Sequence, residues 1–487
     1  MGAMNEGAAA PNGAAASAEA EAKPSDTVDG ERASESAEDA AEPSGATAED
    51  AADGAENLPV DSAPMPVRHV RAWCAALLAG ALAGALAIAF GFAADAAAAL
   101  FVDYPALCWG LPLAGIISMI AYRALRVPYP VSTPTVAKLA AERRKIPFAL
   151  VPAVFVGSCL TFACGGSAGK EGAALQMGAA SGGKIGRALG LHSLDERAVV
   201  LSGMAGGLSA LLGTPIAAAI FAIELIDYRV RNAERILMVF AAAFVAKALA
   251  VAVGAPNIIL SVAGVDITAA TAGASALIAL AACLAGVAFC LALKAGRRAV
   301  RKGSSARMTL AIVGGLAIAA GLWTFGHSGY SGTGAAEMRF ALAGQVTDPY
   351  FLGKLVLTAA TLAFGFKGGE IMPTMCIGAC LGSWAGHVMG IDPALGAAVG
   401  FIAMLAACTN CPIAAAMAAC EAFGVANLPY YVLVAAGSWA ITMGVSLYGN
   451  TTLAGDLADR WRRSRALAKG QAASSRSEGR RESNSQE

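Results

Sequence analysis

An almost unbroken apolar body, residues 67–455, constrains the fold of this chain more than any other feature. Only 14% of all residues are charged, whereas a soluble domain carries roughly 25%. Because a helix needs about 20 apolar residues to cross a bilayer, the body predicts an all-α polytopic membrane protein. The stretches expected to span the membrane are Arg71–Phe101, Leu107–Arg123, Ile146–Cys164, Ile236–Val253, Thr271–Leu293, Met308–Phe325, Tyr350–Phe366 and Pro429–Leu447.

Shorter apolar pieces, interrupted by Gly and Pro, lie between these stretches. They are Glu171–Leu189, Val199–Leu212, Thr214–Leu225, Thr374–Met389, Ala394–Cys408 and Pro412–Phe423. Half-length helices are tolerated inside a membrane only where protein buries them or where they line a cavity. A bundle that contains many of them favours a transporter or channel over a receptor anchor.

The charged residues gather at the two ends of the chain, where they cancel to a net charge of 0. Residues 1–66 are rich in Ala, Gly, Glu, Asp, Ser and Pro, and we expect them to form a disordered acidic tail. Residues 456–487 form a basic tail. Because this tail, Arg68 and Arg71 flank the last and first spans, both termini are expected on the cytoplasmic side of the cell membrane.

The remaining motifs give no sign of catalysis. The chain has 11 Cys and 4 His, but they are scattered without the spacing of metal ligands, so no metal site is expected. We find no phosphate-binding loop and no nucleophile triad in the sequence. The sequence therefore predicts a protein that is not an enzyme, needs no cofactor and binds no nucleic acid.

Two copies of one segment indicate an internal repeat. TPIAAAIFAIEL in the first half corresponds to CPIAAAMAACEA in the second, with Glu224 opposite Glu421. The body is therefore expected to consist of two repeats, about residues 67–228 and 271–423. Since both glutamates come late in short helices, we expect them to cap or hydrogen-bond a neighbouring helix.

A second pair of copies places carboxylates at helix starts. GKEGAALQMGA corresponds to GGEIMPTMCIGA, and the alignment sets Glu171 opposite Glu370. Transporters of this kind bind ligands at the repeat interface, where helix N-termini favour an anion. A buried carboxylate there can take the place of the anion and leave when it is protonated, which is the role expected for Glu171. The alternative is a cytoplasmic turn in which Lys170 and Glu171 are solvated.

At these residues the sequence resembles the CLC family of chloride channels and proton-coupled anion antiporters. GKEGA resembles the GREGP segment of that family, GGEIMP its GxFxP segment, and SLYGN its tyrosine segment. The resemblance implies an all-helical homodimer in lipid, with one pore per subunit for a halide and protons, and with Glu171 as the external gate. The anion-binding positions it implies are Val131, Ser132, Gly169, Lys170, Gly172, Gly369, Ile371, Met372 and Tyr448.

Three departures from the family pattern resemble its fluoride-exporting branch. Val131 occupies the serine position of the first anion segment, and Leu225 the position of the inner proton-transfer glutamate. Glu370 stands where ordinary members have an apolar residue, and the resemblance assigns it to the ion and proton pathway. A protonated carboxyl can donate a hydrogen bond to fluoride, so we expect fluoride export by antiport with protons.

The sequence also leaves alternatives for the ion, for two site residues and for the class of protein. The ion could be chloride, moved by a channel or by a Cl⁻/H⁺ antiporter of the same family. Glu370 could instead pair with Lys367 at the membrane surface, and Tyr448 could be an interfacial belt residue. A regulatory membrane protein without transport and a sodium-coupled transporter are the competing classes. No clear set of sodium ligands is found in the sequence.

Overall fold

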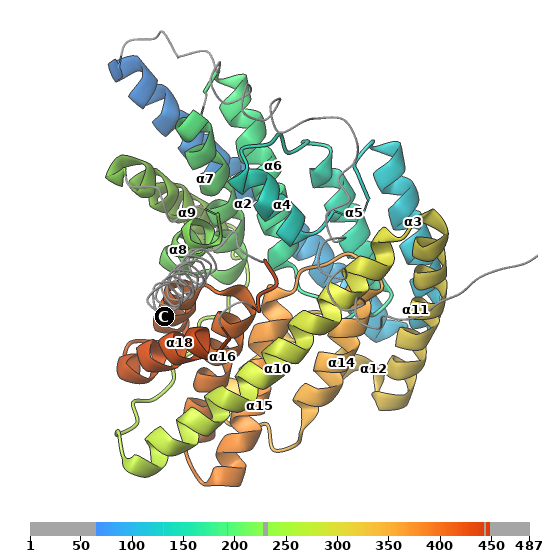
Figure 1. Cartoon of the computed structure of the whole chain (residues 1–487), viewed down its shortest axis with the longest axis vertical. Coiled ribbons are helices and arrows are strands. Elements are labelled where there is room, and N and C mark those ends of the chain that lie inside the picture. The colour runs from blue at the N-terminus through green and yellow to red at the C-terminus, as the bar shows by residue number, and fades with distance from the viewer. Residues whose placement is uncertain (1–64, 130, 192, 227–231, 443–444, 449–487) are drawn as a thin grey trace, which may run out of the picture. The chain divides into compact units, whose positions relative to one another are not determined.

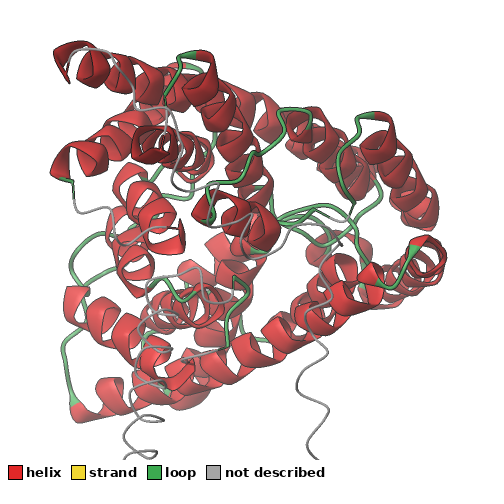
Figure 2. Ribbon diagram, turned by 45° about the horizontal axis from the view of Figure 1, so that its top comes forward, coloured by secondary structure: helices red, strands yellow, loops and turns green. Residues whose placement is uncertain are grey.

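The computed structural model describes residues 65–129, 131–191, 193–226, 232–442 and 445–448 (Figure 1). The basic tail expected at 456–487 lies outside these residues. So does the expected acidic tail, except that its last two residues, Met65 and Pro66, already belong to the first described helix. Within the described ranges every regular element is a helix and no strand forms, as Figure 2 shows.

The described residues form a succession of α-helices and one 3-10 helix. They are α2 (Met65–Asp103), the 3-10 helix η1 (Pro105–Gly110), α3 (Leu111–Ala124), α4 (Thr133–Ala141), α5 (Leu150–Ala163), α6 (Glu171–Ala188), α7 (Ser193–Leu212), α8 (Pro215–Ile226), α9 (Ala233–Ala252), α10 (Ala269–Arg301), α11 (Ser304–Phe325), α12 (His327–Tyr330), α13 (Ala335–Leu342), α14 (Tyr350–Ala363), α15 (Ile371–Met389), α16 (Pro393–Thr409), α17 (Pro412–Phe423) and α18 (Leu428–Thr442).

Helix length divides the elements into full spans and half-length pieces. Among the described residues, 5 helical segments are long and apolar enough to cross a membrane: α2, η1 with α3, α9, α10 and α11. Three expected spans prove too short, because α5 and α14 have 14 residues each and α18 has 15. At 1.5 Å per residue such helices reach only about 21 Å. The prediction was wrong there because Ile146, Phe366 and Leu447, which extended the apolar stretches, lie buried in non-helical segments.

Similar close contacts between helices occur in the two halves of the body that the sequence predicts to be repeats. In the first half α6 packs on α7, and a Cβ at Gly178 would lie 2.2 Å from the carbonyl oxygen of Gly203. In the second half α15 packs on α16, and a Cβ at Gly378 would lie 2.2 Å from the carbonyl oxygen of Gly400. Glycine at these positions allows each pair of helices to approach closely within the protein.

These contacts correct the alignment of the two glutamate segments by one residue. Because Gly178 corresponds to Gly378 and both helices begin at equivalent places, Glu171, the first residue of α6, corresponds to Ile371, the first residue of α15. Glu370 is the N-cap of α15 and corresponds to Lys170, the N-cap of α6. The sequence alignment was wrong because it matched the two glutamates by residue type. It ignored that the second segment is one residue longer than the first. The two carboxylates therefore occupy different positions in the two repeats.

A reciprocal pair of helix caps joins α8 and α17. The Glu224 carboxylate, late in α8, accepts hydrogen bonds of 3.2 and 2.7 Å from the N–H groups of Ile413 and Ala414 at the start of α17. In return, Glu421 of α17 caps the first turn of α8 with hydrogen bonds of 3.0 and 2.6 Å. The capping role expected for both glutamates is confirmed, since each satisfies N–H groups that a helix leaves unpaired.

Removing either cap should destabilise the protein without changing its ion pathway. Loss of a capping side chain costs about 1 kcal/mol, so Glu224→Ala and Glu421→Ala should each lower the midpoint of thermal unfolding in detergent. Glu224→Gln is the matched control, because its amide oxygen still accepts one hydrogen bond, and its midpoint should lie between those of wild type and Glu224→Ala. Equal midpoints for wild type and both alanine variants would contradict the capping role.

Candidate functional site: two helix starts at the repeat interface

The loops that lead into α6 and α15 meet backbone to backbone. Gly169 and Gly369 exchange two hydrogen bonds of 2.6 Å each and form an isolated antiparallel bridge. A Cβ at Gly369 would lie 2.5 Å from the backbone nitrogen of Gly172, so a side chain there would push the two segments apart. The sequence thus brings the two helix N-termini side by side, with the unpaired N–H groups of both first turns in one place.

Glu171 is the most deeply buried carboxylate of this site. Its side chain is 0% exposed, and within the described part of the chain neither carboxylate oxygen has a hydrogen-bond partner. The adjacent Lys170 is also buried, and its ammonium lies 2.8 Å from a carboxylate oxygen of Asp95 on α2. The alternative of a solvated Lys170–Glu171 turn is therefore wrong. Because the Lys170 charge is paired with Asp95, no described residue forms an ion pair with Glu171.

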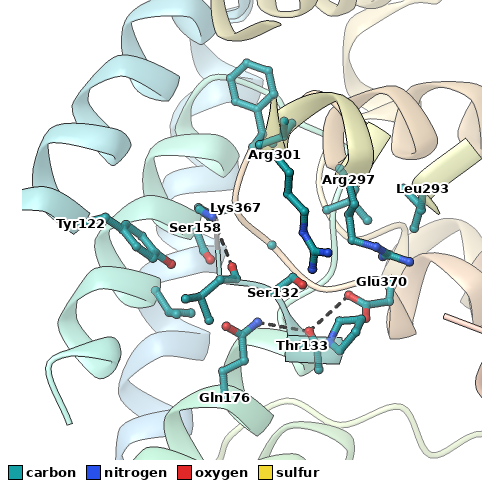
Figure 3. A pocket seen from close by; sticks show the side chains of 18 residues that line it. Tyr122, Ser132, Thr133, Ser158, Gln176, Leu293, Arg297, Arg301, Lys367 and Glu370 are labelled. Carbon is teal, nitrogen blue, oxygen red and sulfur yellow. Dashed lines mark hydrogen bonds between the residues drawn. The ribbon is translucent and has the colours of Figure 1, made fainter. Parts of the chain in front are cut away.

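Glu370, the N-cap of α15, belongs to a short chain of hydrogen bonds. Its Oε2 accepts a hydrogen bond of 3.3 Å from the Thr133 hydroxyl, which in turn accepts one of 3.1 Å from the Gln176 amide (Figure 3). Its Oε1 has no hydrogen-bond partner among the described residues, although the side chain is only 5% exposed. The site thus holds a second buried carboxylate with an unused acceptor.

Lys367 does not pair with Glu370, so that alternative is wrong. Its ammonium lies 3.9 Å from the centre of the Tyr129 ring and 4.6 Å from that of Tyr122, and it donates a hydrogen bond of 3.3 Å to the Val131 carbonyl. These cation–π contacts replace water around the buried charge. Lys367 therefore holds the segment before α4 against the loop before α15.

Tyr448 lies inside the protein and not in a membrane-facing belt. Its side chain is 4% exposed, lies within electrostatic reach of Glu370 and packs edge-on against Phe221, with 6.4 Å between ring centres. The belt alternative is therefore wrong. Tyr448 therefore lies next to the carboxylate of the second helix start.

The remaining sequence-predicted positions surround the same place. Ser132 is the N-cap of α4, and its hydroxyl lies 3.2 Å from that of Thr135, while Val131 turns its carbonyl to Lys367. Ile371 and Met372 form the buried first turn of α15. Like the first residues of any helix, they lack intrahelical acceptors for their N–H groups. The structure therefore gathers all the predicted positions around the two helix starts.

A polar cavity of about 70 Å³ adjoins Glu370. We call it the polar cavity; its polar lining is Tyr122, Ser132, Thr133, Ser158, Gln176, Arg297, Arg301, Lys367 and Glu370 (Figure 3). Sequence reasoning missed Tyr122, Thr133, Ser158, Gln176, Arg297 and Arg301. Thr133 could have been found because it follows Ser132 in PVSTP. The two arginines lie beyond the expected end of the span Thr271–Leu293.

The fold and the site define an all-helical protein with several apolar, membrane-length helices, in which the starts of α6 and α15 meet side by side. Residues 131–443 match the family model described as voltage gated chloride channel. The chain therefore belongs to this family, the CLC family, whose members are anion channels and transporters and not enzymes.

Three proteins of this family are similar to the chain over most of its length. A protein of Pseudomonas syringae pv. tomato, named chloride/fluoride channel protein, is 28% identical over 356 residues, which cover 71% of this chain and 78% of the relative. A solved structure of a CLC-type fluoride/proton antiporter is 29% identical with a TM-score of 0.70, and the match covers 77% of this chain and 96% of that one. A slow cyanobacterial Cl⁻/H⁺ antiporter, 18% identical with a TM-score of 0.65 over 80% of this chain and 97% of its own, shares the fold.

Proposed function

We propose that this CLC protein exports fluoride in exchange for protons, with Glu171 as the gate and Glu370 on the ion and proton pathway. The observation that carries the proposal is Glu370 itself, a buried carboxylate with one unused oxygen at the start of α15. When protonated it can donate a hydrogen bond, and fluoride is a strong acceptor. The fluoride/proton antiporter at 29% identity supports the same choice of ion.

The two carboxylates then act at different steps. Ionised Glu171 occupies the anion position between the helix starts, where N–H groups favour negative charge. Protonation neutralises its side chain, so that it leaves and an anion takes its place. Leu225 cannot carry a proton and is fully buried, so Glu370, with Tyr448 and Thr133 beside it, is the inner group that exchanges protons.

Efflux from proteoliposomes tests the choice of ion. Vesicles loaded with fluoride or chloride are diluted into anion-free medium, and an ion-selective electrode follows the release, with and without a proton gradient. Fluoride should leave much faster than chloride and should respond to the gradient. Chloride leaving as fast as fluoride would favour the alternative, a chloride channel or Cl⁻/H⁺ antiporter, and would remove the fluoride assignment.

Replacing Glu370 by glutamine should abolish proton coupling, because the amide cannot bind and release a proton. Proton movement into vesicles, followed with a pH-sensitive dye during fluoride efflux, should fall to background. Glu337→Gln removes a half-buried carboxylate outside the site and is the matched control; its coupling should match that of wild type. Coupling that survives Glu370→Gln would show that another group relays the proton.

We also propose that the protein forms a homodimer in the cell membrane, with both termini in the cytoplasm. The small residues of α8 and α17 allow close helix contact, and Ile413 and Leu433 expose apolar side chains next to them. Arg68, which flanks the first span at the end expected to be cytoplasmic, forms an ion pair of 3.0 Å with Asp195, which Arg235 also contacts at 2.9 Å. Cross-linking in membranes that yields only monomer, or terminal tags that react with an external label, would contradict these assignments.

A further inference from the structure

The N-cap residues of α6 and α15 carry charges, and each faces a charge of opposite sign from a long helix. In the first repeat, Lys170 faces Asp95, which lies near the end of α2. In the second repeat, the equivalent residue Glu370 faces Arg297, which lies near the end of α10. The repeat thus builds the same pair twice, with the signs of the two charges reversed.

The two pairs differ in their geometry. Lys170 and Asp95 form a closed ion pair, with hydrogen bonds of 2.8 and 2.9 Å to the two carboxylate oxygens. Among the described residues, no ion pair within 4.0 Å joins Glu370 to Arg297, although each lies within electrostatic reach of the other. The second pair is therefore open, and the polar cavity is lined by both of its members.

The side chains around the open pair leave hydrogen-bond donors facing the cavity. The Arg297 guanidinium donates one long hydrogen bond, of 3.5 Å, to the Leu447 carbonyl. Arg301, one turn further along α10, lines the same cavity, and Figure 3 shows both arginine side chains reaching into it from that helix. The third cation, Lys367, is held by the Tyr122 and Tyr129 rings. Two guanidinium groups thus face one buried carboxylate with an unused oxygen.

We infer that the open pair is a binding site for a small inorganic anion, held by Arg297 with Arg301 behind it. The anion and ionised Glu370 compete for the Arg297 guanidinium. Both are negative hydrogen-bond acceptors, and a guanidinium offers only hydrogen-bond donors. The inference deepens the proposed function, on which it rests for the identity of the anion as a halide. Arg297 is then the residue through which a bound anion favours the neutral form of Glu370.

Anion binding to purified protein in detergent tests the site without any transport. Sodium fluoride and sodium chloride are titrated by calorimetry into wild type, Arg297→Gln, Arg297→Lys and Arg298→Gln. Arg297→Gln should weaken halide binding about tenfold, as the loss of a charged hydrogen bond does, and Arg297→Lys should restore most of the affinity. Arg298, an exposed neighbour on α10, is the matched control, and its variant should bind like wild type.

If Arg297→Gln does not fold, a substitution of the more distant arginine still tests the site. Arg301→Gln should weaken binding by about threefold, because it removes the more distant charge. Glu370→Gln should strengthen binding, since it removes the competing carboxylate. Wild-type protein that binds no halide, equal affinities for wild type and the folded arginine variants, or an equal loss in Arg298→Gln would each overturn the inference.

Efflux kinetics separate this inference from the proposed function. The fluoride concentration that gives half-maximal efflux should rise about tenfold in Arg297→Gln. Wild-type vesicles that exchange fluoride for protons, beside an Arg297→Gln variant of unchanged half-saturation, would overturn the inference alone. Protein that binds halide through Arg297 but moves no protons would contradict the proposed antiport alone.

Discussion

Replacing Glu171 by glutamine should abolish proton-coupled anion exchange. Glutamine has nearly the shape of the protonated side chain but cannot become an anion, so it can neither close the anion position between the helix starts nor carry a proton. Because Glu171 is fully buried and its oxygens have no partner in the described part of the chain, no neighbouring group compensates for the loss.

The measurement follows anion and proton movement in the same vesicles. Proton movement in Glu171→Gln should be at background, with anion movement either uncoupled or blocked, while Glu337→Gln should match wild type in both. Thermal unfolding of the purified variant should resemble that of wild type, since removing an uncompensated buried charge costs no stability. Wild-type proton-coupled flux in Glu171→Gln would show that the gate lies elsewhere.

Adding a methyl group at Gly172 should disable the site by separating its two halves. A Cβ there would lie 2.8 Å from the Gly369 Cα and 2.9 Å from the Thr133 hydroxyl oxygen. Overpacking of this kind costs about 1–3 kcal/mol, and backbone atoms on the facing segment cannot turn away as a side chain can. Fluoride efflux from vesicles containing Gly172→Ala should fall to background.

Gly273→Ala is the matched control for this substitution. Gly273 also lies in a helix, but a Cβ there would meet nothing within 4 Å, so its efflux should equal that of wild type. Its stability should rise slightly, since alanine favours a helix more than glycine does. Gly172→Ala protein that is well folded and transports fluoride like wild type would contradict the close approach of the two helix starts.

The two helix starts and the two caps could be predicted because they depend on local sequence. GKEG and GGEIMP each combine glycines, which allow close approach of two backbones, with a charged residue at a helix start. The capping roles of Glu224 and Glu421 followed from their place in two copies of one segment. Such features can be predicted from sequence because the residues concerned lie close together in the chain or recur at a fixed distance.

The partners of the buried charges could not be predicted in the same way. Arg297 and Arg301 follow an apolar span, where basic residues are typical of a cytoplasmic flank. Their place beside Glu370 depends on how α10 packs. Lys367 is three residues from Glu370 in sequence, yet its ammonium turns to aromatic rings of other segments. Pairings of this kind are set by tertiary packing, which hydropathy and residue spacing do not predict.

The lengths of the short helices could not be predicted from hydropathy either. Residues buried in protein and residues facing lipid are equally apolar, so the stretches around α5, α14 and α18 appeared long enough to span the membrane. The same property hid the register of the two helix starts, because the glycines that fix it are buried helix contacts, such as Gly378 against Gly400.

The most direct test of proton-coupled fluoride export is whether a fluoride gradient drives protons uphill. Vesicles containing the purified protein are loaded with fluoride at equal pH inside and outside, clamped at zero membrane potential with potassium and valinomycin, and diluted into fluoride-free medium. External pH is then recorded. Antiport predicts that protons enter the vesicles as fluoride leaves, so that the medium becomes alkaline until a protonophore is added. Fluoride release with no change in external pH before the protonophore would contradict antiport.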